Sequence, residues 1–194
     1  MNFYNLKSGF NILPMLKEVS ENYKDFDITD RRQTLVPVQR ETKTTYLLKD
    51  IDLYKYKPTE EYKKYHQCRK FFNWFTKQYS GEIMRAAVVL LPTDKTVYPH
   101  RDGEPFKKDK DRFHLVLSGY YDYNIHSDKI GTIGTYEGWG PVVETVKFCA
   151  GDLWWFDNKK VHSAQNTSPL PRISIIFDVF ECAWRDHINN NSVV

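Results

Sequence analysis

The pattern of hydrophobic and polar positions changes character near residue 81. Before that point, apolar side chains recur every three or four residues in two segments, 13–24 and 59–79, and this spacing predicts two helices. The longer segment carries its apolar side chains at Tyr62, Tyr65, Cys68, Phe72 and Phe75. Such a stripe is typical of a helix that covers one face of a sheet, with Thr59 as its N-terminal cap and Gly81 just past its end.

From residue 82 onward the pattern consists of short β-branched and aromatic runs separated by turn residues. We expect strands at 83–91, 95–100, 113–118, 121–125, 143–148, 152–156, 161–166 and 173–180. Turn sequences such as Pro92-Thr93-Asp94 and Pro169-Leu170-Pro171 separate them. A run of short strands with no helices between them predicts a mainly β fold with antiparallel sheets, namely a double-stranded β-helix (jelly roll, cupin-like).

We expect one domain that spans residues 1–194. In this interpretation residues 1–80 supply N-terminal buttressing helices, residues 81–182 form the double-stranded β-helix core, and residues 188–194 form a frayed tail. The composition fits, because 13 Tyr, 12 Phe and 5 Trp supply the large rings that a β-rich core packs.

Charge and cysteine content exclude several classes of protein. The net charge of +3 comes from interspersed residues of both signs, so nucleic acid is not an expected partner, whereas an acidic small molecule is compatible. Cys68, Cys149 and Cys182 are widely spaced, which favours free thiols over a disulfide framework or a cysteine zinc site. The polar N-terminal sequence predicts neither a signal peptide nor a membrane span, and we therefore expect a cytoplasmic protein.

Candidate metal ligands lie at the end of one expected strand. His100 and Asp102 are two residues apart, so on a strand they direct an imidazole and a carboxylate to the same side. In a jelly roll the later strand that carries His162 returns beside the first and can supply a third ligand. Two histidines and one carboxylate on one face are the arrangement of non-haem iron(II) oxygenases. Zinc accepts the same ligands, so these residues alone do not name the metal.

Three further residues predict contacts with a bound ligand. Arg172 opens the last apolar strand, and a buried guanidinium there needs an anion such as the distal carboxylate of 2-oxoglutarate. The alternative is an arginine that caps the preceding turn or pairs with Asp178. Arg112 and His114 share one face of their strand, which favours a polar pair directed at a ligand over a solvated edge strand.

Taken together, these motifs resemble those of the aspartyl/asparaginyl β-hydroxylase family of 2-oxoglutarate-dependent oxygenases. The resemblance covers about residues 85–180, and its motifs stand in the family's order. They are YPH (98–100), RFHL (112–115), GDLWWFD (151–157), His162 and RISIIFDVF (172–180).

The resemblance implies a set of roles for the residues of this chain. His100 and His162 would bind Fe(II), and Arg112, His114 and Arg172 would hold the co-substrate 2-oxoglutarate. It further implies dioxygen as a reactant, ascorbate as a candidate accessory reductant, and an aspartyl or asparaginyl side chain as the group that is hydroxylated.

The chain departs from that family at two positions. Familiar members have a small residue where this chain has Asp102, so a full two-histidine, one-carboxylate set of ligands is available here. The family also has a hydroxyl group on the strand before the Pro-His motif, where this chain has apolar residues around Val88. That contact with the co-substrate is either missing here or supplied from elsewhere, for instance by Tyr98 or Ser174. Asp178 is expected to be a buried acid.

The function expected from the sequence is therefore a 2-oxoglutarate-dependent dioxygenase acting on a peptide or small-molecule substrate. The loops 101–112 and 131–141 are expected to form the rim that selects the substrate. Alternatives are a prolyl or small-metabolite hydroxylase of the same superfamily, a non-catalytic cupin-like binding module, and a zinc-dependent hydrolase or isomerase. Succinate formation from 2-oxoglutarate separates the oxygenases from the other classes.

Overall fold

A computed structural model describes residues 1–22, 27–28, 42–50, 56–102, 110–127 and 140–186. Its strands are β1 Phe3–Lys7, β2 Asp27–Ile28, β3 Lys43–Asp50, β4 Tyr56–Pro58, β5 Glu82–Leu91, β6 Thr96–His100, β7 Lys110–Ser118, β8 Tyr120–His126, β9 Val142–Cys149, β10 Leu153–Phe156, β11 His162–Gln165 and β12 Arg172–Phe180. Its helices are α1 Leu13–Glu21, α2 Glu60–Lys64 and α3 His66–Tyr79.

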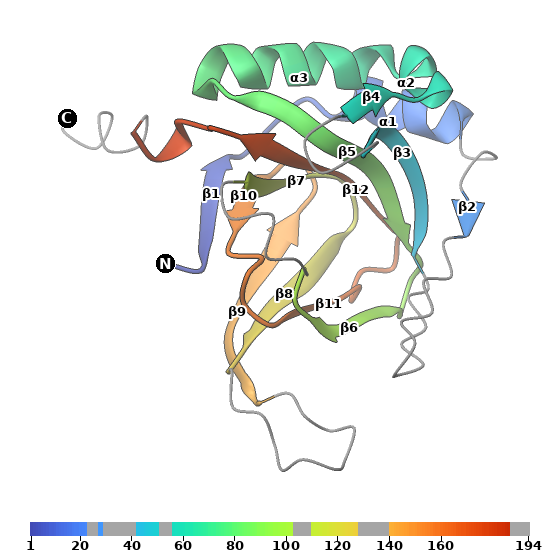
Figure 1. Cartoon of the computed structure of the whole chain (residues 1–194). Helices are drawn as coiled ribbons and strands as arrows, with labels where there is room; N and C mark the ends of the chain where they lie inside the picture. The colour runs from blue at the N-terminus through green and yellow to red at the C-terminus, as the bar shows by residue number, and fades with distance from the viewer. Residues whose placement is uncertain (23–26, 29–41, 51–55, 103–109, 128–139, 187–194) are drawn as a thin grey trace.

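From β5 onward the chain passes back and forth between two antiparallel sheets, except that the consecutive strands β8 and β9 pair within one sheet. The larger sheet has the order β1-β10-β7-β12-β5-β3-β2, with β4 paired to β3, and the smaller sheet has the order β6-β11-β8-β9. Figure 1 shows the two sheets facing each other as a flattened barrel. This is a mainly β, double-stranded β-helix, so the predicted fold class is confirmed. Every predicted strand is present, and the largest shift is at β7, which begins at Lys110 and not at residue 113.

The first 80 residues contribute more than the predicted helices. Strand β1 pairs with β10 at one edge of the larger sheet, and β3 pairs with β5 towards the other edge. Pairing with β3 supplies the backbone partners that β5 would otherwise lack. The sequence carried a signal for β3, because Thr44, Thr45 and Tyr46 are β-branched or aromatic, but no regular alternation of polar and apolar positions accompanied it.

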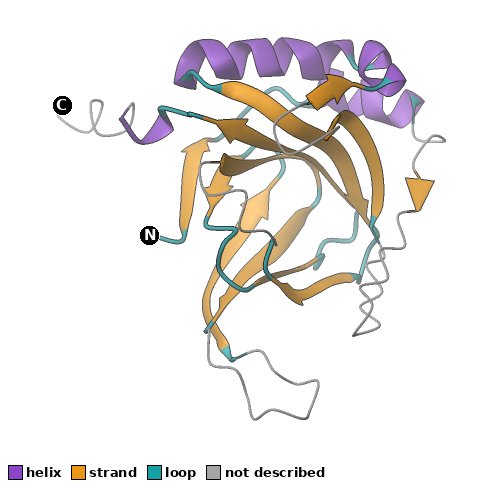
Figure 2. Ribbon diagram, in the orientation of Figure 1, coloured by secondary structure: helices purple, strands orange, loops and turns teal. Residues whose placement is uncertain are grey.

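The helices cover the outer face of the larger sheet, as Figure 2 shows. Phe177 of β12 meets α3 there, with ring centroids 5.6 Å from Phe71, 5.5 Å from Phe72 and 4.9 Å from Phe75. Side chains alternate along a strand, so the outer face of β12 is apolar and its inner face is available for other chemistry. The outer-face residues of β12 are Ile173, Ile175, Phe177 and Val179.

The predicted helix 59–79 is in fact two helices, because Tyr65 leaves the helical conformation between α2 and α3. Thr59 caps α2 as predicted, accepting a hydrogen bond from the Tyr62 backbone N–H. The start of α3 is capped from a distance by Glu18 of α1, whose carboxylate accepts from the backbone N–H groups of Gln67 at 2.8 Å and Cys68 at 3.2 Å. Of the helices that the structure describes, none has the length and apolar character to span a membrane.

We expect Glu18→Ala to lower the free energy of unfolding by about 1–2 kcal/mol, because it removes an acceptor from buried N–H groups at a helix N-terminus. Urea unfolding followed by circular dichroism measures the change. Glu21→Ala is the matched control, since Glu21 lies on the same helix and makes only an exposed ion pair with Lys17 at 3.8 Å. The control should change stability by less than about 0.5 kcal/mol. Equal effects of the two substitutions would contradict the capping role.

Candidate functional site

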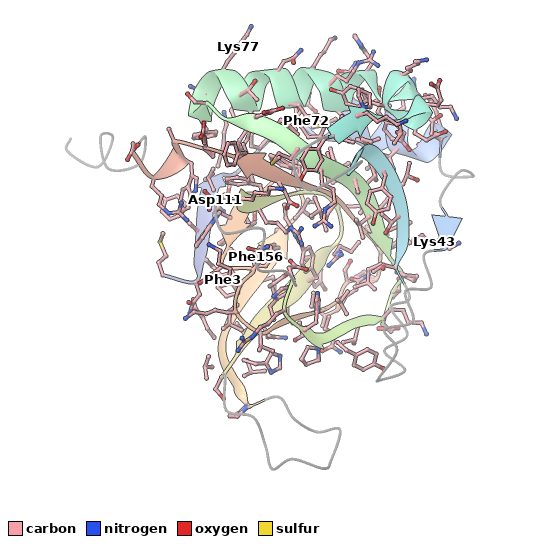
Figure 3. The ribbon with its side chains drawn as sticks, in the orientation of Figure 1. Phe3, Lys43, Phe72, Lys77, Asp111 and Phe156 are labelled. Atoms are coloured by element: carbon pink, nitrogen blue, oxygen red, sulfur yellow. The ribbon has the colours of Figure 1, made fainter. Side chains whose placement is uncertain are left out.

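A pocket lies between the inner faces of the two sheets. The predicted metal ligands and co-substrate contacts all line it, namely His100, Asp102, Arg112, His114, His162 and Arg172. Figure 3 shows side chains from both sheets filling this interior, with Phe156 labelled on its left side. The Phe156 ring lies 5.0 Å from that of His114 and 5.1 Å from that of His162, so aromatic packing fixes both imidazoles.

The three predicted ligands lie within reach of one another. His100 on β6 and His162 on β11 are direct cross-strand partners, and their ring centroids are 4.4 Å apart. Asp102 follows just beyond β6, with Oδ1 3.6 Å from His100 Nε2 and Oδ2 3.6 Å from His162 Nε2. The ligand atoms of the three side chains all lie within 4.8 Å of one another, which is close enough to surround a single ion.

Backbone carbonyl groups fix the orientation of both histidines. Nδ1 of His100 lies 2.7 Å from the carbonyl oxygen of Tyr98, and Nδ1 of His162 lies 2.8 Å from that of Lys160. A carbonyl oxygen only accepts, so each Nδ1 carries the proton and donates it. In a neutral imidazole with its proton on Nδ1, Nε2 carries the lone pair, and here Nε2 of each ring faces Asp102, from where it can bind a metal.

Asp102 is ionised at neutral pH. Burial by itself would raise the pKa of Asp102, but the neighbouring side chains of His100, His162 and Arg85 outweigh burial and hold the pKa below its usual range. An ionised carboxylate facing two imidazole lone pairs is a donor set suited to a divalent cation.

Arg112 does not lie free in the pocket as a contact for a co-substrate. Its Nε donates to Asp178 Oδ1 at 2.6 Å and its Nη2 donates to Asp178 Oδ2 at 2.9 Å, while its Nη1 donates to Asp102 Oδ2. Arg85 also pairs with Asp178, at 3.1 Å. Asp178 is the buried acid that the sequence led us to expect. It does not pair with Arg172, because the two residues are six apart on one strand, which separates them by about 20 Å.

The surroundings of Arg172 differ from those of Arg112. It is 2% exposed, its Cζ lies 4.3 Å from the centre of the Tyr121 ring, and its Nε is buried without a hydrogen-bond partner. Among the residues that the structure describes, no carboxylate pairs with it. The contact with the Tyr121 ring offsets part of the cost of burying this charge, and an anion that reached the guanidinium would stabilise it further. Ser174 lies on the same face of β12, while Tyr98, the other expected hydroxyl, is half exposed.

His114 is buried and neutral. Its Nδ1 lies 3.1 Å from the Tyr121 hydroxyl oxygen, and its ring packs edge-on against Tyr123. Burial, with the nearby charge of Arg172, holds the pKa of His114 well below its usual range. Burial also raises the pKa of Tyr121 to about 12, so its hydroxyl stays protonated.

The pocket is also lined by residues that were not identified from the sequence. Thr42, Thr44 and Tyr46 from the β3 segment line it, together with Arg85 of β5. Arg85 could have been found, because it shares a strand face with other inward positions in an otherwise apolar run. The expected rim loops lie mostly outside the described residues, which include only 101–102, 110–112 and 140–141 of them.

Comparisons with known proteins are limited to the fold. No family model matches the chain, and no curated protein matches it. A 2OG-Fe(II) oxygenase family oxidoreductase from Burkholderia pseudomallei is similar at 11% identity, over 72% of this chain and 68% of that one, with a TM-score of 0.46. The Cnp3 cupin domain of Schizosaccharomyces pombe is similar at 10% identity, over 76% and 70%, with a TM-score of 0.42.

A third similar structure is a predicted oxalate decarboxylase from Thermotoga maritima, at 14% identity over 72% of this chain and 80% of that one, with a TM-score of 0.39. At these identities and TM-scores, the likenesses carry no argument about activity. The chemistry of this chain has to be inferred from its own pocket.

The buried neutral state of His114 predicts a loss of stability in mild acid. Below about pH 6.5 the unfolded chain binds a proton at this histidine and the folded chain does not, so the free energy of unfolding falls as pH falls, by up to about 1.4 kcal/mol per pH unit. We expect the stability difference between the wild type and His114→Leu to shrink between about pH 7.5 and about pH 5.5 in urea unfolding.

His66→Leu is the control for this measurement, because it removes a histidine that is exposed and lies outside the pocket. Titrating groups that do not interact with His114 are common to all the proteins and cancel in the differences. A stability difference between wild type and His114→Leu that stays constant with pH would mean that His114 takes up its proton in the folded state.

Proposed function

We propose that the chain is an Fe(II)- and 2-oxoglutarate-dependent dioxygenase that hydroxylates an unactivated C–H bond. The observation that carries the proposal is that a buried arginine, Arg172, which pairs with no carboxylate among the described residues, lies in the same pocket as a two-histidine, one-carboxylate group. The three ligands would hold the metal from one side and leave its other positions for reactants. Arg172 would hold the far end of an acidic co-substrate.

The donor set fits iron(II). His100 and His162 offer Nε2 lone pairs that backbone hydrogen bonds hold in place, and Asp102 offers a charged oxygen. When bound, iron(II) supplies the activation of dioxygen for which side chains have no equivalent. The protein residues would bind and orient the reactants, and the aromatic rings around His162 would exclude water from the buried side of the site.

Arg172 would be the principal contact for 2-oxoglutarate. Its guanidinium fork matches a carboxylate, and burial strengthens the pairing because water does not compete. His114 lines the wall of the same pocket as a neutral group, so it would contribute a hydrogen bond without adding charge. Arg112, which the sequence resemblance implied as a third contact, already pairs with Asp102 and Asp178, and we assign it no direct role in binding the co-substrate.

An aspartyl or asparaginyl side chain, in a peptide or as a free amino acid, is the proposed target. Among the described residues at the pocket, Arg85, Arg112 and Arg172 outnumber Asp102 and Asp178, and the charges of iron(II) and 2-oxoglutarate would cancel, so a surplus of positive charge remains. The charge favours an acidic or amide group near the metal over an apolar one. A prolyl peptide or a neutral metabolite is the competing substrate class.

Turnover tests the proposal directly. With iron(II), ascorbate and dioxygen, we expect the protein to form succinate from 2-oxoglutarate, and His162→Ala to abolish this. Arg172→Ala should raise the Michaelis constant for 2-oxoglutarate by roughly 10- to 100-fold, since it removes one charge-assisted contact. Arg185→Gln is the control, because Arg185 pairs with Asp111 away from the pocket.

A wild-type protein that binds 2-oxoglutarate without forming succinate would be a cupin-like binding module instead. A Michaelis constant that stays unchanged in Arg172→Ala would remove Arg172 from the co-substrate site while leaving the oxygenase proposal in place.

The substrate class has its own test. Incubation with peptides and free amino acids that carry Asp or Asn should give a mass gain of one oxygen, about 16 Da, as expected for metal-assisted hydroxylation. Matched peptides in which Ala replaces the Asp or Asn should show no gain. A gain found only on proline-containing peptides or neutral metabolites would refute the substrate class and leave the oxygenase activity standing.

A further inference from the structure

A chain of alternating charges runs through the interior towards the proposed metal site. Arg85 pairs with Asp178, Asp178 pairs with Arg112, and Arg112 pairs with Asp102. Arg112 and Asp178 are 6% and 4% exposed, so both depend on these partners for their charge to be tolerated inside the protein. Asp102 is the member of the chain that also faces both histidines.

Arg112 is fixed more firmly in the fold than Asp102, the residue to which its Nη1 donates. It stands in the middle of β7, directly opposite Asp178 on β12 in the strand register, and the two form a bidentate pair through Nε and Nη2. Both strands are interior members of the larger sheet. This leaves Nη1 directed at Asp102 Oδ2 in a fixed position.

Asp102, by contrast, lies outside any strand. Strand β6 ends at His100, and the backbone N–H of Asp102 makes a 3.3 Å hydrogen bond to the carbonyl oxygen of Asn158. Neither histidine holds the carboxylate at hydrogen-bonding distance, because each Nε2 is 3.6 Å away. Among the described residues, Arg112 is therefore the donor that sets the orientation of this carboxylate.

We propose that Arg112, anchored by Asp178, is a positioning residue that presents Asp102 to the metal as the third ligand. The arginine holds Oδ2 and leaves Oδ1, the oxygen nearer His100, for the ion. Its role is thus to act on the metal through Asp102, and not to contact the co-substrate. This inference rests on the proposed function only in requiring a metal at His100, Asp102 and His162.

The test measures metal affinity without turnover. Nickel(II) binds imidazole ligands tightly, so weakened sites stay measurable by titration calorimetry. Groups that orient a metal ligand typically change affinity by about 10- to 100-fold when replaced. We expect that loss in Arg112→Lys, which keeps the charge without the fork. Asp178→Asn, which weakens the anchor, should move the affinity in the same direction. Arg185→Gln breaks an Arg–Asp pair at the neighbouring position of β7 and should leave affinity unchanged.

A double-mutant cycle separates positioning from general damage to the fold. In an Asp102→Ala background, Arg112→Lys should have no further effect on the dissociation constant, because the ligand through which it acts is gone. Circular dichroism and thermal unfolding check that each variant is folded. If Arg112→Lys does not fold, the same cycle is run with Asp178→Asn.

Two results would overturn the inference. One is an Arg112→Lys protein that binds nickel(II) as tightly as the wild type or more tightly, which would make the arginine a competitor for the carboxylate. The other is an equal loss in the presence and absence of Asp102. In both cases the wild type still binds metal, so the proposed function stands. A wild type that fails to bind metal would refute the proposed function as well.

Discussion

Strand β12 has to satisfy two incompatible environments with one alternating run of side chains. On one face its residues meet the aromatic side of α3, where Phe177 packs among Phe71, Phe72 and Phe75. On the other face, which is turned towards the interior between the sheets, it carries Arg172 near one end and Asp178 near the other, and both are buried. A slip of one residue in register would place these charges under the helix and the apolar rings in the pocket, so the packing of the core also fixes the chemistry of the site.

The electrostatics of the interior follow from that constraint. Asp178 has two arginine partners and Arg112 has two carboxylate partners, so the charges at one end of the pocket balance one another. Arg172, at the opposite end of β12, has an aromatic ring beside it and no carboxylate among the described residues. The pocket is thus asymmetric. At one end the buried charges pair with one another, whereas at the other end the charge of Arg172 has no carboxylate partner among the described residues.

The sequence predicted what depends on periodicity and failed where the answer depends on which strands are neighbours. The run 173–180 was recognisable from its apolar residues, and His100 with Asp102 from their spacing. The pairing of Asp178 with Arg112 was not, because it requires knowing that β12 lies beside β7. Strand β3 was missed for a related reason. It is a strand because it pairs with β5, and its own sequence lacks the regular alternation of polar and apolar residues that would have predicted it.

The hydrogen bonds that orient the two histidines have a consequence for how such a site persists through sequence change. Their acceptors are the main-chain carbonyl groups at positions 98 and 160, and every amino acid supplies a carbonyl there. Substitution at those positions can therefore alter the side chain without altering the tautomer. The hydrogen bonds that orient the two imidazoles therefore depend on backbone geometry, and they can persist while the residues at positions 98 and 160 change.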